Sequence, residues 1–120
     1  MKKKILVVER DKDILQILDV ILTRQDYQVF SLPTENEALQ KTIEIKPDAF
    51  LLDIISPTED GTKLCRAIKA TPEIKHIPVI VLSTHFDNSQ IKNICADDIV
   101  SKPFDIDELI EAVNKNVSHN

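Results

Sequence analysis

Apolar and polar residues follow one another along this chain with two different periods. Continuous apolar runs span Lys4–Val8, Ala49–Asp53 and Val79–Ser83, and they have the length and the bulky side chains of buried strands. Shorter runs at Tyr27–Phe30 and Asp98–Ser101 predict two weaker strands. The three continuous runs are the most apolar, so we expect them to lie in the middle of a sheet.

Between these runs, apolar residues recur every three or four positions, which is typical of helices with one buried side. Asp11 is expected to cap the first helix and Asp105 the last. Thr34 and Glu37 have the spacing of a capping box and predict a second helix that runs to about Ile45. The buried sides of the first and last helices would consist of Ile14, Leu15, Leu18, Ile21 and Leu22, and of Ile106, Leu109, Ile110, Val113 and Val117.

Two more helices complete the alternation of strand and helix. One is expected from about Gly61 to Ala70, and a short one near Gln90–Ile94. Parallel strands need helical crossovers, and such crossovers are right-handed. The order of elements therefore predicts an α/β fold, with a parallel sheet that is covered by helices on both faces.

Length and charge limit the function classes. The 120 residues suit a single domain, and the net charge of -5 argues against nucleic-acid binding through bulk charge. No apolar run approaches the roughly 20 residues of a membrane span. The basic start is followed by Ile5–Val8, which is too short for a signal-peptide core, so we expect a cytoplasmic protein with no membrane contact. Gly61 is the single glycine, which excludes a Gly-rich phosphate loop.

The two cysteines, Cys65 and Cys95, lie 30 positions apart and do not have the spacing of a metal site. We expect both to be small buried residues with free thiols in a reducing compartment.

Residues that can do chemistry follow most of the predicted strands. They are Glu9, Arg10 and Asp11 after the first strand, Asp53 at the end of the third, Ser83 and Thr84 at the fourth, and Lys102 after the fifth. Parallel strands bring these ends together at one edge of the sheet, where α/β proteins bind their ligands. Carboxylates with a hydroxyl and a lysine suit a divalent cation and a phosphoryl group.

Each of these residues also has a plain structural interpretation. Asp53 would be a capping or turn aspartate, Ser83 a turn residue and Lys102 a solvated surface charge. An ionised carboxylate beside Leu51 and Leu52, however, is costly unless it is paired or reactive. We therefore interpret Asp53 as the centre of a functional site, in which a carboxylate can itself act as a nucleophile.

Five segments now identify a resemblance: Ile5–Glu9, Leu51–Pro57, Asp60–Gly61, Pro78–Ser83 and Lys102–Phe104. In these segments the chain resembles the receiver domain of two-component response regulators, over essentially its whole length. The resemblance implies a flavodoxin-like, doubly wound sheet of five parallel strands in the order 2-1-3-4-5. It implies a single receiver domain over residues 1–120, and no output domain is expected.

The resemblance also implies residue roles. Asp53 would be the phosphoacceptor, taking a phosphoryl group from a sensor histidine kinase or a phosphotransfer protein. Ser83 would be the switch hydroxyl, and Lys102 would contact the phosphate. The peptide bond between Lys102 and Pro103 is expected to be cis.

The magnesium site is where the chain departs from the family. The resemblance implies Mg²⁺ bound by Glu9, Asp53 and the backbone carbonyl of Ile55. The second position of the acidic pair, which normally ligates the metal, is Arg10. Three arrangements are open: Arg10 turns to solvent, Arg10 pairs with Asp53 and replaces the metal's charge, or Asp11 compensates. We expect weakened Mg²⁺ affinity and a lowered pKa of Asp53.

Two further departures concern the switch. Ile99 stands where receivers often have an aromatic residue, and isoleucine can repack but cannot repeat the aromatic rotation. Thr84 replaces a common small alanine after the switch hydroxyl. His85 in the same loop is more easily explained as a solvated histidine than as a phosphate contact.

Two functions remain open. The first is a signalling phosphoacceptor, not an enzyme, that meets its kinase through the first helix and signals by protein contact through its fourth helix, fifth strand and fifth helix. The second is a pseudo-receiver, in which Arg10 holds Asp53 in a salt bridge and the domain binds partners without phosphorylation. The resemblance also leaves a homodimer possible. A haloacid-dehalogenase-type phosphatase is set aside because Ile55 stands where its second aspartate would be, and flavin binding because Glu9–Asp11 would repel the cofactor's phosphate.

Overall fold

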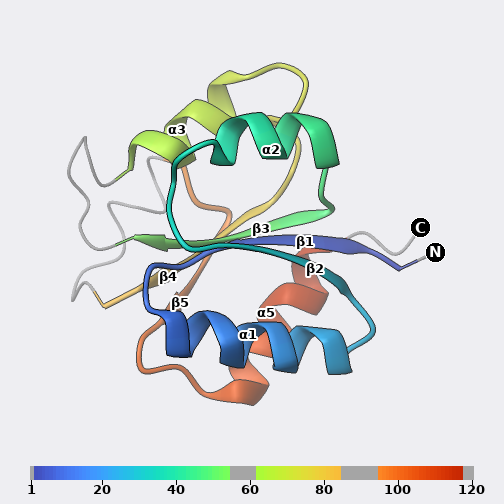
Figure 1. Ribbon diagram of the computed structural model, residues 1–120, viewed down its shortest axis with the longest axis vertical. Helices are drawn as coiled ribbons and strands as arrows, with labels where there is room; N and C mark the ends of the chain where they lie inside the picture. Colours follow the sequence, from blue (N-terminus) through green and yellow to red (C-terminus); the bar gives the residue numbers. More distant parts are fainter. Residues whose placement is uncertain (1, 55–61, 85–94, 118–120) are drawn as a thin grey trace.

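Five parallel strands form one sheet in the order β2-β1-β3-β4-β5 (Figure 1). The structure is a computed structural model that describes residues 2–54, 62–84 and 95–117. The strands are β1 (Lys4–Val8), β2 (Gln28–Leu32), β3 (Ala49–Ile54), β4 (Val79–Ser83) and β5 (Asp98–Ser101). All pairings along the sheet are parallel. The predicted α/β fold and the 2-1-3-4-5 order are confirmed.

Helices cover both faces of the sheet. Those described are α1 (Lys12–Arg24), α2 (Ala38–Ile45), α3 (Lys63–Ala70) and α5 (Ile106–Asn116). In Figure 1, α1 and α5 lie below the sheet, and α2 and α3 lie above it. Within the described ranges, no helix is long and apolar enough to cross a membrane. The short helix predicted near Gln90–Ile94 falls outside the described residues, as does Gly61.

Alternate side chains of each central strand point into two separate apolar layers. Leu6, Phe50 and Val81 pack on the side of α2 and α3. Ile5 and Leu51, with their neighbours on β4, pack on the side of α1 and α5. Both faces of the sheet are thus buried, which explains why the central strands are apolar at every position instead of at every second one.

The helix caps show where short-range sequence signals succeed and fail. Asp11 accepts hydrogen bonds from the backbone N–H groups of Asp13 and Ile14 at 2.9 and 3.2 Å, as predicted. The capping box predicted from Thr34 and Glu37 is wrong. Glu37 adopts a left-handed backbone (φ 64°) directly before α2 and makes no side-chain cap hydrogen bond. In a capping box, the glutamate at the third helical position accepts a hydrogen bond from the capping residue. Glu37 precedes the helix and cannot take that part.

The expectation of two free thiols is also wrong. Cys65 on α3 and Cys95 ahead of β5 are both buried, as predicted, but they are joined in a disulfide. Their Cα atoms lie 5.7 Å apart, inside the range that a disulfide requires. The separation of 30 residues concealed this contact, because it arises when the crossover through β4 returns the chain to α3.

Candidate functional site

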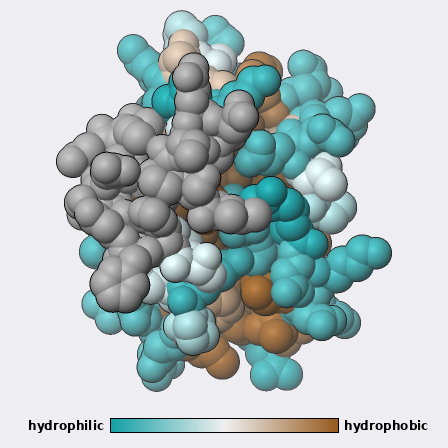
Figure 2. All heavy atoms as spheres, turned by 90° about the vertical axis from the view of Figure 1, so that its left-hand side faces the viewer, coloured by the Kyte–Doolittle hydropathy of each residue, from teal (hydrophilic) through white to brown (hydrophobic). Residues whose placement is uncertain are grey.

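The predicted site residues converge at the edge of the sheet where the strands end. Glu9 follows β1, Asp53 is the last residue but one of β3, Ser83 ends β4, and Lys102 follows β5. The parallel register brings Ile54 beside Ser83, and Ser83 beside Ser101. This edge lies on the left of Figure 1 and faces the viewer in Figure 2.

Lys102 joins the two carboxyl groups of the site. Its Nζ atom donates to Glu9 Oε1 at 2.5 Å and to Asp53 Oδ1 at 3.0 Å. The side chains of Lys102, Glu9 and Asp53 are 11%, 0% and 10% exposed, so the three charges meet away from bulk water. The predicted cis bond between Lys102 and Pro103 is present. Residues 93 and 49 positions apart in the sequence thereby form one ion cluster.

Arg10 pairs with Asp53, which is the second of the three arrangements considered. Its Nε atom lies 3.6 Å from Asp53 Oδ2, and the Arg10 side chain is half exposed. Asp11 does not compensate at this site, because its Oδ1 atom caps α1. Both oxygens of Asp53 therefore face a cation, Lys102 on one side and Arg10 on the other.

Other predicted residues take less central places. Ser83 is buried, and its backbone carbonyl accepts a hydrogen bond from the Lys102 N–H at 2.9 Å. Ile99 on β5 is half buried and packs against the core on the α3 side of the sheet. Thr84 is exposed. Ile55, the expected carbonyl ligand, and His85 lie outside the described residues.

Burial and a neighbouring carboxyl group raise the pKa of Glu9. Burial is the largest cause of this rise, and a hydrogen bond with Asp53 adds to it. Lys102 lowers the pKa of Glu9, but the first two causes outweigh it and the pKa reaches about 7. Glu9 Oε2 has no hydrogen-bond donor in the described part of the chain. Burial and the neighbouring Asp53 carboxyl group therefore favour the protonated form of Glu9 more than water would.

Asp53 stays ionised in the same surroundings. Burial alone would raise the pKa of Asp53, but hydrogen bonds with Glu9 and Lys102, and the charges of Lys102 and Arg10, outweigh it and hold the pKa below its usual value. Burial likewise disfavours charged Lys102, and its hydrogen bonds to Glu9 and Asp53 outweigh that and raise its pKa. The Asp53 carboxylate thus lies between the side chains of Lys102 and Arg10.

Open oxygens and charge decide whether a divalent cation fits. Nowhere in the described residues do three or more His, Cys, Asp or Glu side chains form a group that could hold a metal. Both Asp53 oxygens and Glu9 Oε1 already face cations, which leaves Glu9 Oε2 as the open oxygen of the pair. Arg10 and Lys102 would also repel an incoming dication. The charges of Arg10 and Lys102 among the described residues therefore oppose Mg²⁺ at the two carboxyl groups.

One residue of this neighbourhood escaped the sequence analysis. Burial raises the pKa of Glu35, and it is close enough to Arg10 and Asp53 for both charges to affect that pKa. Glu35 lies in the connection between β2 and α2, not at the end of a strong strand. No local pattern marked it, because only the sheet order places β2 beside β1 and hence this connection beside Arg10.

Comparisons with known proteins agree with this geometry. Residues 5–114 match the family model described as the response regulator receiver domain. A putative response regulator from Chloroflexus aurantiacus is 29% identical, with a TM-score of 0.86 over 96% of this chain and 97% of that one. A signal receiver domain of a histidine kinase from Syntrophus aciditrophicus is 30% identical, with a TM-score of 0.82 over 94% and 88%.

A third structure bears on the fold alone. The receiver domain of a sensor histidine kinase from Pseudomonas aeruginosa is 23% identical, with a TM-score of 0.84 over 97% of this chain and 98% of that one. That protein holds a magnesium ion in its active-site cleft. The family match spans residues 5–114, which is nearly the whole chain. This chain belongs to the response regulator receiver domain family.

Proposed function

We propose that this receiver accepts a phosphoryl group on Asp53 from a histidine kinase or a phosphotransfer protein and signals by protein contact. The observation that carries the proposal is the ionised Asp53 carboxylate at the sheet edge, with Lys102 Nζ 3.0 Å from Oδ1. A carboxylate must be deprotonated to act as a nucleophile. Its pKa, held below the usual value, keeps Asp53 in that form at neutral pH.

The chain's own residues suggest how the transfer proceeds. An Asp53 oxygen attacks phosphorus, the bond from phosphorus to the donor's histidine nitrogen breaks, and that nitrogen takes up a proton. Lys102 then exchanges part of its contact with Asp53 for a phosphoryl oxygen. Ser83, buried at the adjacent strand end, donates its hydroxyl to another phosphoryl oxygen.

Arg10 is proposed to supply charge that a metal supplies elsewhere. A half-exposed ion pair is worth about 1 kcal/mol or less, so Arg10 can leave Asp53 Oδ2 for a phosphoryl oxygen at little cost. Removing one partner of the buried Lys102 cluster would cost about 3–5 kcal/mol. Lys102 therefore stays while Arg10 moves, and its guanidinium fork suits the phosphoryl group.

One specific observation favours the second candidate, a pseudo-receiver. Both Asp53 oxygens are already paired with cations, which would block phosphoryl transfer if Arg10 did not move. The domain would then bind partners in a single state. The two candidates differ in whether Asp53 can be phosphorylated at all.

A surface for the phosphoryl donor is proposed on α1. Ile17 and Val20 on α1 and Ile106 at the start of α5 are 49%, 47% and 52% exposed, and they line one hollow with Ile21 and Arg24. Apolar spheres reach the surface in the lower part of Figure 2, at the height of α1 and α5 in Figure 1. Such a face suits an apolar helix of the donor. We propose that this contact between α1 and the donor forms in the cytoplasm and that nucleic acid has no part in it.

Acetyl phosphate should add one phosphoryl group to the wild-type protein, and Asp53→Asn should abolish the adduct because the amide is not a nucleophile. Intact mass spectrometry measures both. Asp19→Asn, which changes an exposed carboxylate on α1, should leave the adduct unchanged. An unmodified wild type combined with a modified Arg10→Asp variant would instead establish the pseudo-receiver.

Mg²⁺ should bind weakly to the wild type because the positive charges of Arg10 and Lys102 repel it, and Arg10→Asp should bind it at least about tenfold more tightly. Isothermal titration calorimetry measures the affinities. Lys2→Asp, at the opposite end of β1, makes the same charge change and should not tighten binding. Equal affinities in the wild type and Arg10→Asp would refute the role given to Arg10.

Stability should fall as pH rises between about 4.5 and about 7, by up to roughly 3 kcal/mol, because folded Glu9 holds its proton more tightly than unfolded Glu9. The contribution is complete below the unfolded pKa and is lost as pH rises through the folded pKa. Urea unfolding in metal-free buffer measures it. Glu9→Gln should remove most of this pH dependence. A smaller pH dependence should remain because burial also raises the pKa of Glu35.

Exposed Glu44 on α2 offers the matched control, since Glu44→Gln should keep the wild-type pH slope. The contribution of Asp53 lies in a different pH range. The pKa of Asp53 is lowered in the folded protein, so ionised Asp53 stabilises the fold at pH values above the pKa that Asp53 has in the unfolded chain. This stabilisation is lost only as the pH falls through the lower folded pKa. A slope that survives in Glu9→Gln would contradict the proton assigned to Glu9.

Ile17→Lys should slow phosphoryl transfer from the preferred kinase about tenfold or more by placing a charge in the apolar contact. Profiling against all histidine kinases of the source organism identifies that kinase and gives the rate. Gln40→Lys adds the same charge on exposed α2 and should have no effect. Acetyl phosphate should modify both variants normally, so an equal loss with acetyl phosphate would show damage to the fold instead.

A further inference from the structure

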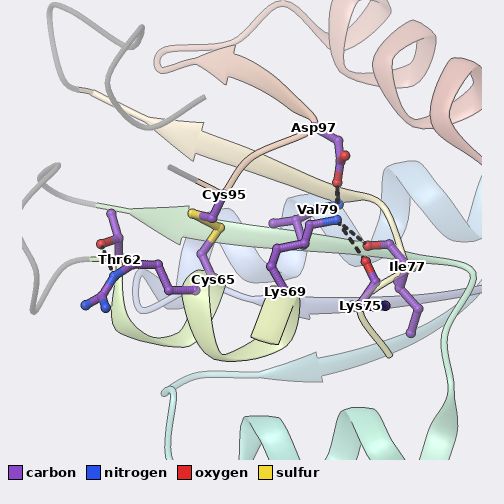
Figure 3. The surroundings of a disulfide bond; sticks show 9 residues. Thr62, Cys65, Lys69, Lys75, Ile77, Val79, Cys95 and Asp97 are labelled. Atoms are coloured by element: carbon purple, nitrogen blue, oxygen red, sulfur yellow. Dashed lines mark hydrogen bonds and ion pairs between the residues drawn. A yellow bond between two sulfur atoms is a disulfide. The ribbon is translucent and has the colours of Figure 1, made fainter. Parts of the chain in front are cut away.

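A disulfide connects two segments that meet only in the folded chain. Cys65 is the third residue of α3, and Cys95 lies three residues before β5 (Figure 3). Cys65 is 0% and Cys95 7% exposed. Their Cα distance of 5.7 Å shows that the backbone already places the two sulfurs for bonding.

A second link between α3 and the chain ahead of β5 lies beside the disulfide. Lys69, one helical turn after Cys65, donates through Nζ to Asp97 Oδ2 at 2.6 Å and to the Ile77 carbonyl at 3.0 Å. Asp97 Oδ2 also accepts the N–H of Val79 at 2.7 Å. Figure 3 shows both links along the same side of α3. The ionic link thus joins α3 to the segment ahead of β5 independently of the covalent one.

We propose that Cys65 and Cys95 are a reversible redox site, a thiol pair that a hydroperoxide converts to this disulfide. A disulfide in a protein that works in the cytoplasm, as proposed above, forms only transiently, because thiols there are kept reduced. The pair is held at bonding distance by α3 and by the Lys69–Asp97 contact. Neither cysteine takes part in the phosphoryl site.

The chemistry balances with one peroxide for each disulfide. The Cys95 sulfur, the more exposed of the two, attacks a peroxide oxygen and becomes a sulfenic acid, with release of one water. The Cys65 sulfur attacks the Cys95 sulfur, forms the S–S bond and releases a second water. Two thiols lose two electrons and two protons, and hydrogen peroxide is reduced to two waters. A dithiol reverses the bond by exchange and leaves as a cyclic disulfide.

The consequence of oxidation follows from what packs around the sulfurs. Both cysteines belong to the apolar core on the α3 side of the sheet, and Ile99 of β5 packs against that core. β5 leads directly to Lys102, which contacts Asp53. The disulfide therefore restrains the segment that would have to repack when Asp53 is phosphorylated, a step that rests on the proposed function. We expect the oxidised form to resist the switch.

The site itself is tested by counting thiols. Wild type reduced with dithiothreitol should carry two alkylated cysteines by intact mass, and none after treatment with hydrogen peroxide. Cys65→Ala should trap a sulfenic acid on Cys95 that reacts with dimedone, while Cys95→Ala should react far less. A disulfide that stays closed in excess reduced glutathione is permanent and would overturn the proposal, as would two free thiols after peroxide.

The consequence is tested by hydrogen exchange and thermal unfolding. Reduction should lower the thermal midpoint by about 10 °C and speed amide exchange in residues 95–101 about tenfold or more. A Cys65→Ala, Cys95→Ala double variant should resemble the reduced form and ignore peroxide. Unchanged exchange in the wild type would refute the restraint on β5.

Acetyl phosphate separates this inference from the proposed function. The reduced form should gain the Asp53 adduct about fivefold faster than the oxidised form. If no adduct forms in either state while exchange in β5 still responds to peroxide, the redox site stands and the phosphoacceptor fails. If the adduct forms at equal rates and exchange does not respond, the phosphoacceptor stands and the restraint on β5 fails, while the thiol count decides the redox site separately.

Discussion

The cluster of Lys102 with Glu9 and Asp53 is the interaction on which the site depends. A buried carboxylate is costly unless a cation meets it, and Lys102 Nζ meets two carboxyl groups at 2.5 and 3.0 Å. The cluster joins the ends of β1, β3 and β5, so it forms only when the parallel order of the sheet is complete. Burial raises the pKa of Glu9, while hydrogen bonds with Glu9 and Lys102 and the charges of Lys102 and Arg10 hold the pKa of Asp53 below its usual value. The cluster thereby favours the ionised Asp53 carboxylate that the proposed phosphoryl transfer requires.

Arg10 changes the balance of this cluster. Where the family resemblance implies a third carboxylate, a guanidinium faces Asp53 Oδ2 at 3.6 Å. The exchange reverses a charge at the position that would otherwise attract a dication, so a site of the same shape favours an anion over a cation. Half-exposed Arg10 is freer to move than buried Lys102. If Arg10 leaves Asp53, the domain can accept a phosphoryl group, and if Arg10 stays, the domain is a pseudo-receiver.

The other face of the sheet bears on the same site through β5. The Cys65–Cys95 bond and the Lys69–Asp97 ion pair both tie α3 to the segment that enters β5. Ile99 packs against the core that contains both sulfurs, and three residues later Lys102 contacts Asp53. The two proposed reactions, at the sulfurs and at the Asp53 carboxylate, would therefore act on β5 from its two ends.

Periodicity predicted the five strands and the α/β class, and residue type predicted the caps at Asp11 and Asp105, because these depend on neighbours along the chain. It placed Asp53, Ser83 and Lys102 at one edge, since parallel strands share their carboxyl ends. The sequence also showed that Arg10 breaks the acidic pair, but left three arrangements open. The tertiary structure chose among them, moved the start of α2 past Glu37, joined Cys65 to Cys95 and brought Glu35 near Arg10. Each of these depends on contacts between elements distant in the chain, whose distances and burial no local pattern encodes.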